Sequence, residues 1–495
     1  MANQIILMDN RQLIPRWHTS RKVMSLHYPV PPNAPQDADL RDEPWLTKAI
    51  KKYDDDPNNL NALDVYVRLI QNETTNHQYF KRVQQQLVND KSNLPEAVQD
   101  IVAPRLHQSD ISEFYTTDRK QVYLIIHKLR NIVKNNPQDA LTWLDLGFYY
   151  SILGEMKKAQ EVMGIGNALA PKNPFVARIY SRHLIHQDDP EKAMYLLNKT
   201  GLTKKEPLIA SALISIGNTF GLRTSTSISQ AKKIIEDYKG NPGFLSELQA
   251  SVATLEIQNG ALRKGRKHLE KAMVHPTENV LAQASWLHHK HQVNLTSLTP
   301  MVTVEGDVNK AYSDQNYSLC RDKLMELFSF QPYSRASLTD AGYLSLVGLN
   351  DPEFIISHSV NRLARKQMSF GELNNLIVAN LSVGNLDNVW DDLDILKAKS
   401  AENNHPDIIG TLQATLGMAL IKFGSIEEGV DLYESSIQTY KKANYTKAAA
   451  VAEFFFYTQI RQHQPNRAIK LKESFIKTAK EHGMHELEAG VKKHN

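Results

Sequence analysis

A spacing of large and small residues within residues 140–173 limits the fold more than any other feature of the chain. This stretch reads ALTWLDLGFYYSILGEMKKAQEVMGIGNALAPKN. Trp143, Leu146 and Tyr150 follow one another at intervals of three and four, so they share one face of a helix. A single pair of helices cannot bury such a face by itself, and neighbours must stack on it. The spacing therefore predicts a repeated helical unit.

Small residues and helix breakers complete the unit. Gly147 and Ala159 are small at the point where two helices would cross, and small side chains let helix backbones approach closely. Gly154 suits the turn between the helices, and Pro171 suits the end of the second one. With Ala140 as the first position, the arrangement resembles the tetratricopeptide repeat (TPR) family, whose unit has about 34 residues. The resemblance implies a right-handed superhelix of stacked helix pairs.

Similar units recur along the chain. They start at Pro174, Ser246, Ala336, Phe370 and Gly410. Helical spacing continues almost throughout, and we find no sustained alternation of the kind that is typical of strands. The sequence therefore predicts an all-α protein with a TPR-like α-solenoid. The rhythm breaks at 294–306, which predicts a join between two arrays, 44–294 and 305–495.

Composition excludes several classes of protein. A single cysteine, Cys320, allows neither an internal disulfide nor a cysteine-based zinc site. No run approaches the roughly 18 apolar residues that a membrane span needs. The N-terminus lacks the basic start of a secretory signal. We therefore expect a cytoplasmic protein that uses neither a membrane nor a cofactor.

Residues 1–43 form a basic, proline-rich arm ahead of the first predicted helix. The arm carries Arg11, Arg16, Trp17, Arg21 and Lys22. Most of the net charge of +4 lies there, so the rest of the chain is nearly neutral. A neutral body argues against a nucleic-acid surface, which needs a basic stripe. We expect the arm either to cap the first repeats or to dock onto an acidic partner.

No group of residues makes a specific catalytic or metal-binding motif. Arg178 and His183 match the Arg-x4-His pattern of HEPN ribonucleases, in which the arginine offsets phosphate charge and the histidine transfers protons. Chance supplies about one such match in a chain of this composition. His288 and His291 could share a helix face and bind a metal ion, but no further ligand lies nearby in the sequence. We therefore expect no catalytic residue and no metal site.

Two arginines stand out once the repeat register is applied. Arg178 and Arg182 fall at positions 5 and 9 of the unit that starts at Pro174, one helical turn apart. The TPR resemblance implies that these positions line the concave groove, with His186 at position 13 beside them. Two guanidinium groups so close repel each other unless an anion lies between them. The pattern predicts an anion site, and the alternative is ion pairing with acids of a neighbouring helix.

The same register predicts an apolar strip next to the arginines. Leu144 and Phe148 fall at groove positions, as do His288 and His291 further along the chain. An apolar strip beside two arginines suits an amphipathic helix or an extended segment that carries acidic residues. The alternative is that the strip is covered within the molecule, for instance by the arm.

We therefore expect a non-enzymatic scaffold or adaptor that acts as a subunit or regulator of a multi-protein complex. Its partner would be a protein or peptide with acidic or carboxylate groups, and self-association of the chain stays open. One alternative is a peptide-sensing regulator that changes its superhelical shape when the ligand binds. Another is a ribonuclease built on Arg178 and His183.

Overall fold

The protein is described by a computed structural model that covers most of the chain. The described residues are 44–71, 77–90, 117–238, 243–274, 276–293, 303–359, 363–402 and 405–494. Within these ranges every regular element is a helix, and none is a strand. The prediction of an all-α protein is confirmed for this part of the chain.

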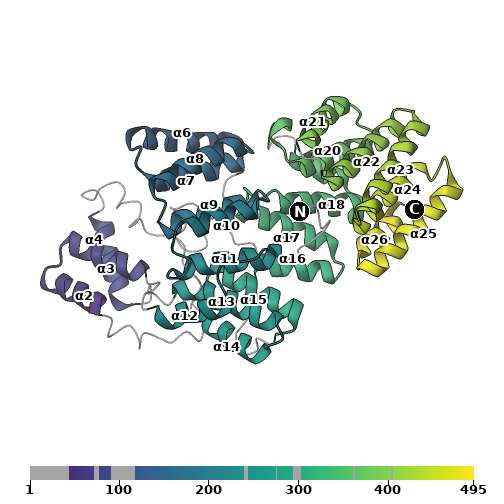
Figure 1. Cartoon of the computed structure of the whole chain (residues 1–495). Coiled ribbons are helices and arrows are strands. Elements are labelled where there is room, and N and C mark those ends of the chain that lie inside the picture. Colours follow the sequence, from purple (N-terminus) through teal and green to yellow (C-terminus); the bar gives the residue numbers. More distant parts are fainter. Residues whose placement is uncertain are drawn as a thin grey trace.

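The first half of the molecule is a column of helices, each lying beside the next (Figure 1). Three helices with their own core precede it, namely α2 (Pro44–Asp55), α3 (Asn59–Gln71) and α4 (Gln78–Asn89). The column itself comprises α6 (Arg119–Asn135), α7 (Ala140–Ile152), α8 (Met156–Leu169), α9 (Pro174–His186), α10 (Pro190–Lys199), α11 (Pro207–Phe220), α12 (Ile228–Asp237), α13 (Gly243–Gln258), α14 (Leu262–Ala272) and α15 (Glu278–His291).

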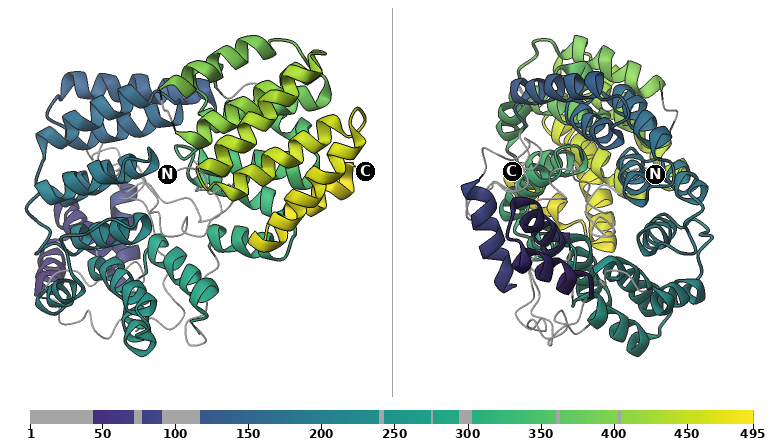
Figure 2. Two further views of the ribbon diagram at one scale, coloured as in Figure 1. Left: turned by 45° about the vertical axis from the view of Figure 1, so that its right-hand side comes forward. Right: turned by 90° about the vertical axis from the view of Figure 1, so that its left-hand side faces the viewer.

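The second half lies beside this column and ends in long helices that pack against one another (Figure 2). It begins with α16 (Val304–Ser313), α17 (Tyr317–Phe330), α18 (Ala336–Leu344), the π-helix η3 (Ser345–Leu349) and α19 (Pro352–Ser359). It continues with the short 3₁₀-helix η4 (Arg365–Gln367), α20 (Phe370–Val383), α21 (Val389–Ala401), α22 (Pro406–Lys422), α23 (Ile426–Lys442), α24 (Thr446–Ile460), α25 (Pro465–His482) and α26 (His485–His494).

Helix starts follow the predicted register, because polar residues cap them. Helices begin at Ala140, Pro174, Ala336 and Phe370, where units were expected to start. The starts expected at Ser246 and Gly410 were wrong, because α13 begins at Gly243 and α22 at Pro406. The side chain of Asp139 accepts hydrogen bonds from the backbone of the first turn of α7, and Asn173 does the same for α9. Such caps satisfy amide groups that a helix start would otherwise leave unpaired. The register therefore gives correct positions for these elements.

The turn between paired helices is also where the register places it. One residue there adopts the left-handed conformation, which glycine, asparagine and aspartate tolerate best. This residue is at the fifteenth position of six predicted units: Gly154, Asp188, Gly260, Asn350, Gly384 and Gly424. The recurrence shows that the chain reverses direction by the same local geometry in both halves.

Close helix crossing in the first unit is confirmed. A Cβ atom added to Gly147 would lie 2.5 Å from Cγ of Met163 and 3.1 Å from the carbonyl oxygen of Ala159. Glycine is therefore needed for α7 to approach α8 this closely. The face that was expected to be buried is mixed, because Leu146 is buried while Trp143 and Tyr150 are only half-buried.

The predicted break at 294–306 falls largely outside the described residues, between the end of α15 and the start of α16. Within the described ranges, none of the helices combines the length and the apolar character that crossing a bilayer requires.

Candidate functional site

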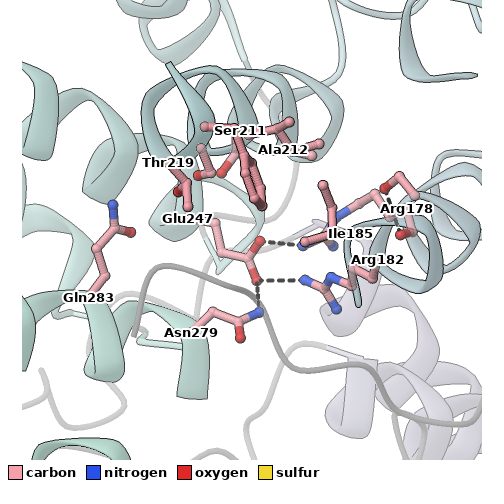
Figure 3. A pocket seen from close by; sticks show the side chains of 13 residues that line it. Arg178, Arg182, Ile185, Ser211, Ala212, Thr219, Glu247, Asn279 and Gln283 are labelled. Atoms are coloured by element: carbon pink, nitrogen blue, oxygen red, sulfur yellow. Dashed lines mark hydrogen bonds and ion pairs between the residues drawn. The ribbon is translucent and has the colours of Figure 1, made fainter. Parts of the chain in front are cut away.

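A pocket opens between α9, α11, α13 and α15, the first helices of consecutive helix pairs (Figure 3). It holds about 600 Å³ of space, part of it open to solvent. Most of its lining residues are polar, but most of the wall surface exposed in the hollow is apolar. The walls are made by Arg178, Ser181, Arg182, Ile185, Ser211, Ala212, Ser215, Ile216, Thr219, Phe220, Glu247, Asn279 and Gln283. We call this site the arginine pocket.

Two arginines of α9 converge on one carboxylate of α13 in the arginine pocket. A guanidinium nitrogen of Arg178 donates to Oε2 of Glu247, and Nη2 of Arg182 lies 3.6 Å from Oε1 (Figure 3). All three side chains are largely buried, with 12%, 13% and 13% of their surface exposed. Ion pairs so shielded from water attract more strongly than pairs on an open surface.

Glu247 is held from the other side by the start of α15. The Thr277 hydroxyl and the Asn279 amide each donate to Oε1 of Glu247 over 3.2 Å. Burial by itself would raise the pKa of Glu247, but Arg178, Arg182 and the hydrogen bonds outweigh burial and lower the pKa to about 2. Glu247 is therefore ionised at neutral pH, and the two arginines with one glutamate leave a net charge of +1 in the pocket.

The reach of the arginines across α11 depends on small residues in that helix. Ser211, Ala212 and Ser215 line the pocket between α9 and α13. The Ser211 and Ser215 hydroxyls each lie 3.0 Å from Oγ of Ser251. Because these side chains of α11 are short, they leave space between α9 and α13. Arg178 can therefore reach Glu247, which lies 69 positions further along the chain.

The arginines are therefore placed together as predicted, but an anion from the chain itself already lies between them. Pairing with an acid of a neighbouring helix was the alternative expected from the sequence. The acid is on α13, beyond the adjacent α11. Glu206, at the start of α11, also interacts electrostatically with Arg178. Nε of Arg178 remains buried without a hydrogen-bond partner among the described residues.

Leu144 and Phe148 do not line an open groove. Both are 0% exposed, and the ring of Phe148 packs edge-on against Tyr333, with 5.2 Å between ring centroids. His186 also meets Tyr333, at 4.9 Å between centroids. The expectation of an exposed apolar strip is corrected, because both residues are buried and Tyr333, a residue of the second half, covers Phe148. The covering element expected from the sequence was the arm.

The histidines on α15 lie away from the arginine pocket. Nδ1 of His288 lies 2.9 Å from the carbonyl oxygen of Val293, and the ring of His291 packs against Trp286 at 5.2 Å. Neither histidine lines the pocket. Within the described ranges, no group of three side chains is arranged to hold a metal ion.

Arg178 and His183 share a helix but not a site. His183 is 1% exposed, does not line the arginine pocket, and has Nδ1 3.4 Å from Oγ of Ser151. Burial, with a contribution from His186 and Lys192, lowers the pKa of His183 to about 3. A buried histidine that stays neutral at pH 7 is not arranged to exchange protons with a substrate in the pocket.

The predicted arm residues Arg11, Arg16, Trp17, Arg21 and Lys22 lie outside the described residues. No family model matches the chain, and no curated protein matches it either.

Several pocket residues were missed although the register contained a signal for them. In a unit that starts at Pro207, Ser211, Ser215 and Thr219 hold the same positions as Arg178, Arg182 and His186 in the preceding one. Glu247 is at the second position of the unit that starts at Ser246, and the TPR resemblance implies that this position also faces the groove. Comparing equivalent positions between units would have brought these residues together.

Proposed function

We propose that the protein is a non-enzymatic, TPR-like helical scaffold that binds a protein or peptide partner at the arginine pocket. The observation that carries the proposal is the pair Arg178 and Arg182, held on Glu247 in a hollow that keeps a net positive charge. A cytoplasmic subunit or regulator of a larger complex would use such a site to hold an acidic segment.

The chemistry of the pocket suits an anionic group attached to a longer chain. Arginine recognises carboxylates through several donors at once, and both Arg178 and Arg182 line the pocket. The hydroxyls of the half-buried Ser215 and Thr219 would bind the polar backbone of an extended segment, while Phe220 offers apolar contact. Anchoring by one charge with weaker contacts alongside is common in peptide recognition.

Glu247 would prepare the arginines for such a ligand. Without a carboxylate between them, the two guanidinium groups would repel each other and lose their common orientation. Holding them in place beforehand reduces the ordering cost that a partner must overcome. The same carboxylate also limits affinity, because it cancels one of the two positive charges.

The experiment follows from these opposing roles. A library of peptides with varied acidic positions is screened against the full chain by fluorescence anisotropy. We expect the bound peptides to contain Asp, Glu or a free C-terminus. Arg182→Gln should weaken their binding by about tenfold, or roughly 1.4 kcal/mol. Glu247→Gln should strengthen it in the folded protein.

Lys232→Gln is the matched control. It removes one charge of the Lys232–Glu256 ion pair, which joins α12 to α13 and does not line the pocket. This variant should bind the peptides as the wild type does. If Arg182→Gln and Lys232→Gln have equal effects, or if the bound peptides lack acidic groups, the proposed site is wrong.

A further inference from the structure

A short link of the second half is inserted into the core of the first half. Residues 331–335 connect α17 to α18 and contain no helical turn. Tyr333 is 1% exposed and belongs to the hydrophobic cluster formed by α6–α11. Among the described members of that cluster, Tyr333 alone comes from beyond α11. Its ring meets Phe148 of α7 and His186 of α9, both edge-on.

Arg335, two residues later, contacts the end of α7. Its Nη2 donates to the carbonyl oxygen of Ile152 over 3.2 Å, and the carbonyl oxygen of Ser151 lies at 3.5 Å. The last carbonyls of a helix have no partner within the helix and attract a cation. Nη1 of Arg335 forms an ion pair with Glu372 of α20 at 3.2 Å. The guanidinium is thus shared between the two halves.

The turn after α7 is shaped to receive this segment. Gly154 has a φ of +74°, and a Cβ atom there would lie 2.4 Å from the carbonyl oxygen of Gln367 and 3.0 Å from Nη2 of Arg335. The Gln367 amide donates to Glu155 over 2.9 Å. A side chain at position 154 would therefore exclude both contacts.

We propose that this face of α7 and α9 is a recognition surface for a segment with an aromatic residue two positions before an arginine, and that Tyr333–Ser334–Arg335 occupies it as an internal ligand. The aromatic ring fills the apolar site between Phe148 and His186. The guanidinium caps the carbonyls at the end of α7. A partner segment with the same pattern binds by displacing residues 331–335.

This surface is separate from the arginine pocket, so the proposal goes beyond the proposed function and does not depend on it. The two sites share α9, since Arg182 of the pocket and His186 of the recognition surface are one helical turn apart. Displacement of Tyr333 would also release the contacts of Arg335 and Gln367 that join the two halves.

The test supplies the internal ligand as a separate molecule. The probe is a fluorescein-labelled peptide with the sequence of residues 331–337, QPYSRAS. Its binding to the wild type, to Arg335→Ala and to Tyr333→Ser/Arg335→Ala is measured by anisotropy. We expect both variants to bind the peptide at least tenfold more tightly than the wild type, in which the surface is occupied. The peptide QPASAAS should bind none of them.

A further substitution maps the binding site. His186→Ala in the Arg335→Ala background should lower peptide affinity at least threefold. Circular dichroism establishes which variants fold. If the double variant does not fold, Arg335→Ala decides the matter with the same peptide. Equal binding by wild type and variants, or no binding by a folded variant, overturns the proposal. Loss of folding in both variants would make the segment an obligate part of the core and would overturn it as well.

Discussion

The Tyr312 hydroxyl donates to Oε2 of Glu486 over 2.8 Å, and this bond joins α16 to α26 across 174 positions of the chain. Tyr343 donates to the other carboxylate oxygen over 3.1 Å. Glu486 is 0% exposed. Burial raises the pKa of Glu486 although the two hydroxyls act in the opposite direction. The last helix is therefore attached through a carboxylate whose ionised form is unfavourable in the fold.

Two substitutions of Glu486 should distinguish the effect of its charge on stability from the effect of its hydrogen bonds. An acid with a raised pKa in the folded state favours folding at low pH, and this contribution is lost as pH rises through the folded-state pKa. Glu486→Gln removes the charge and keeps an acceptor, so we expect the unfolding free energy at pH 7 to be unchanged or slightly higher. Glu486→Leu removes the acceptor of the two half-buried tyrosine hydroxyls and should lower the unfolding free energy by about 1–2 kcal/mol. Amide hydrogen exchange in α26 measures the change in stability for each variant. Equal protection in the two variants would contradict this account.

Acid should destabilise the region around the arginine pocket through Glu247. Its pKa is lowered from 4.5 to about 2, so its contribution to stability is present above about pH 5 and is lost as pH falls towards 2. A difference of one pKa unit corresponds to about 1.4 kcal/mol, which gives roughly 3 kcal/mol in total. Urea unfolding followed by amide exchange in α13 measures this loss. Glu247→Gln should be less stable at pH 7 and should lose stability less steeply than the wild type between pH 5 and 2. A slope equal to that of the wild type would contradict this account.

His183 should remain neutral well below neutral pH. Its folded-state pKa is about 3 against an ordinary value of 6.5, so the neutral form favours folding, and this contribution is lost as pH falls from 6.5 towards 3. Nitrogen NMR of the imidazole should show no protonation at pH 5 in the folded protein. Titration near pH 6 would mean that the side chain is accessible to solvent, and it would reopen the ribonuclease alternative.

Two glycines allow α22 and α23 to approach each other. A Cβ atom on Gly417 would lie 2.8 Å from the carbonyl oxygen of Gly429, and one on Gly429 would lie 2.6 Å from that of Gly417. Because backbone must move, alanine at either position should lower the unfolding free energy by about 1–3 kcal/mol.

Gly164 of α8 provides the matched control, since a Cβ atom there meets nothing within 4 Å. Gly164→Ala should stabilise the protein by up to about 1 kcal/mol, because alanine favours helix. Thermal unfolding compares the three variants. A similar loss in all three would show that close contact is not the reason for the glycines.

Local features of the fold could be predicted from the sequence because local interactions determine them. Asp139 and Asn173 cap helices by bonds within one helical turn. Gly154 and Asp188 adopt the left-handed conformation within the short turn that joins two paired helices. The crossing at Gly147 depends on residues of the same pair. The periodicity of apolar residues reflects such short-range interactions. For this reason the predicted starts of several helices were correct.

The partners of the site residues could not be predicted in the same way. The acid that holds Arg178 lies 69 positions away, and the carbonyls that Arg335 caps lie more than 180 positions away. Such contacts depend on the rotation angle between successive helix pairs. The spacing of apolar residues along the sequence gives no information about that angle. For the same reason Phe148 was expected to face a groove, whereas Tyr333 covers it.

The contacts of Arg335 also bear on how the molecule would respond to tension. Most connections in this chain join neighbouring helices, so a pull on its ends would be expected to peel helices away one pair at a time. Arg335 instead joins the end of α7 to Glu372 of α20, and it closes a loop of almost two hundred residues. A pull applied outside that loop would be carried by this joint and would bypass the helices inside, among them those that form the arginine pocket.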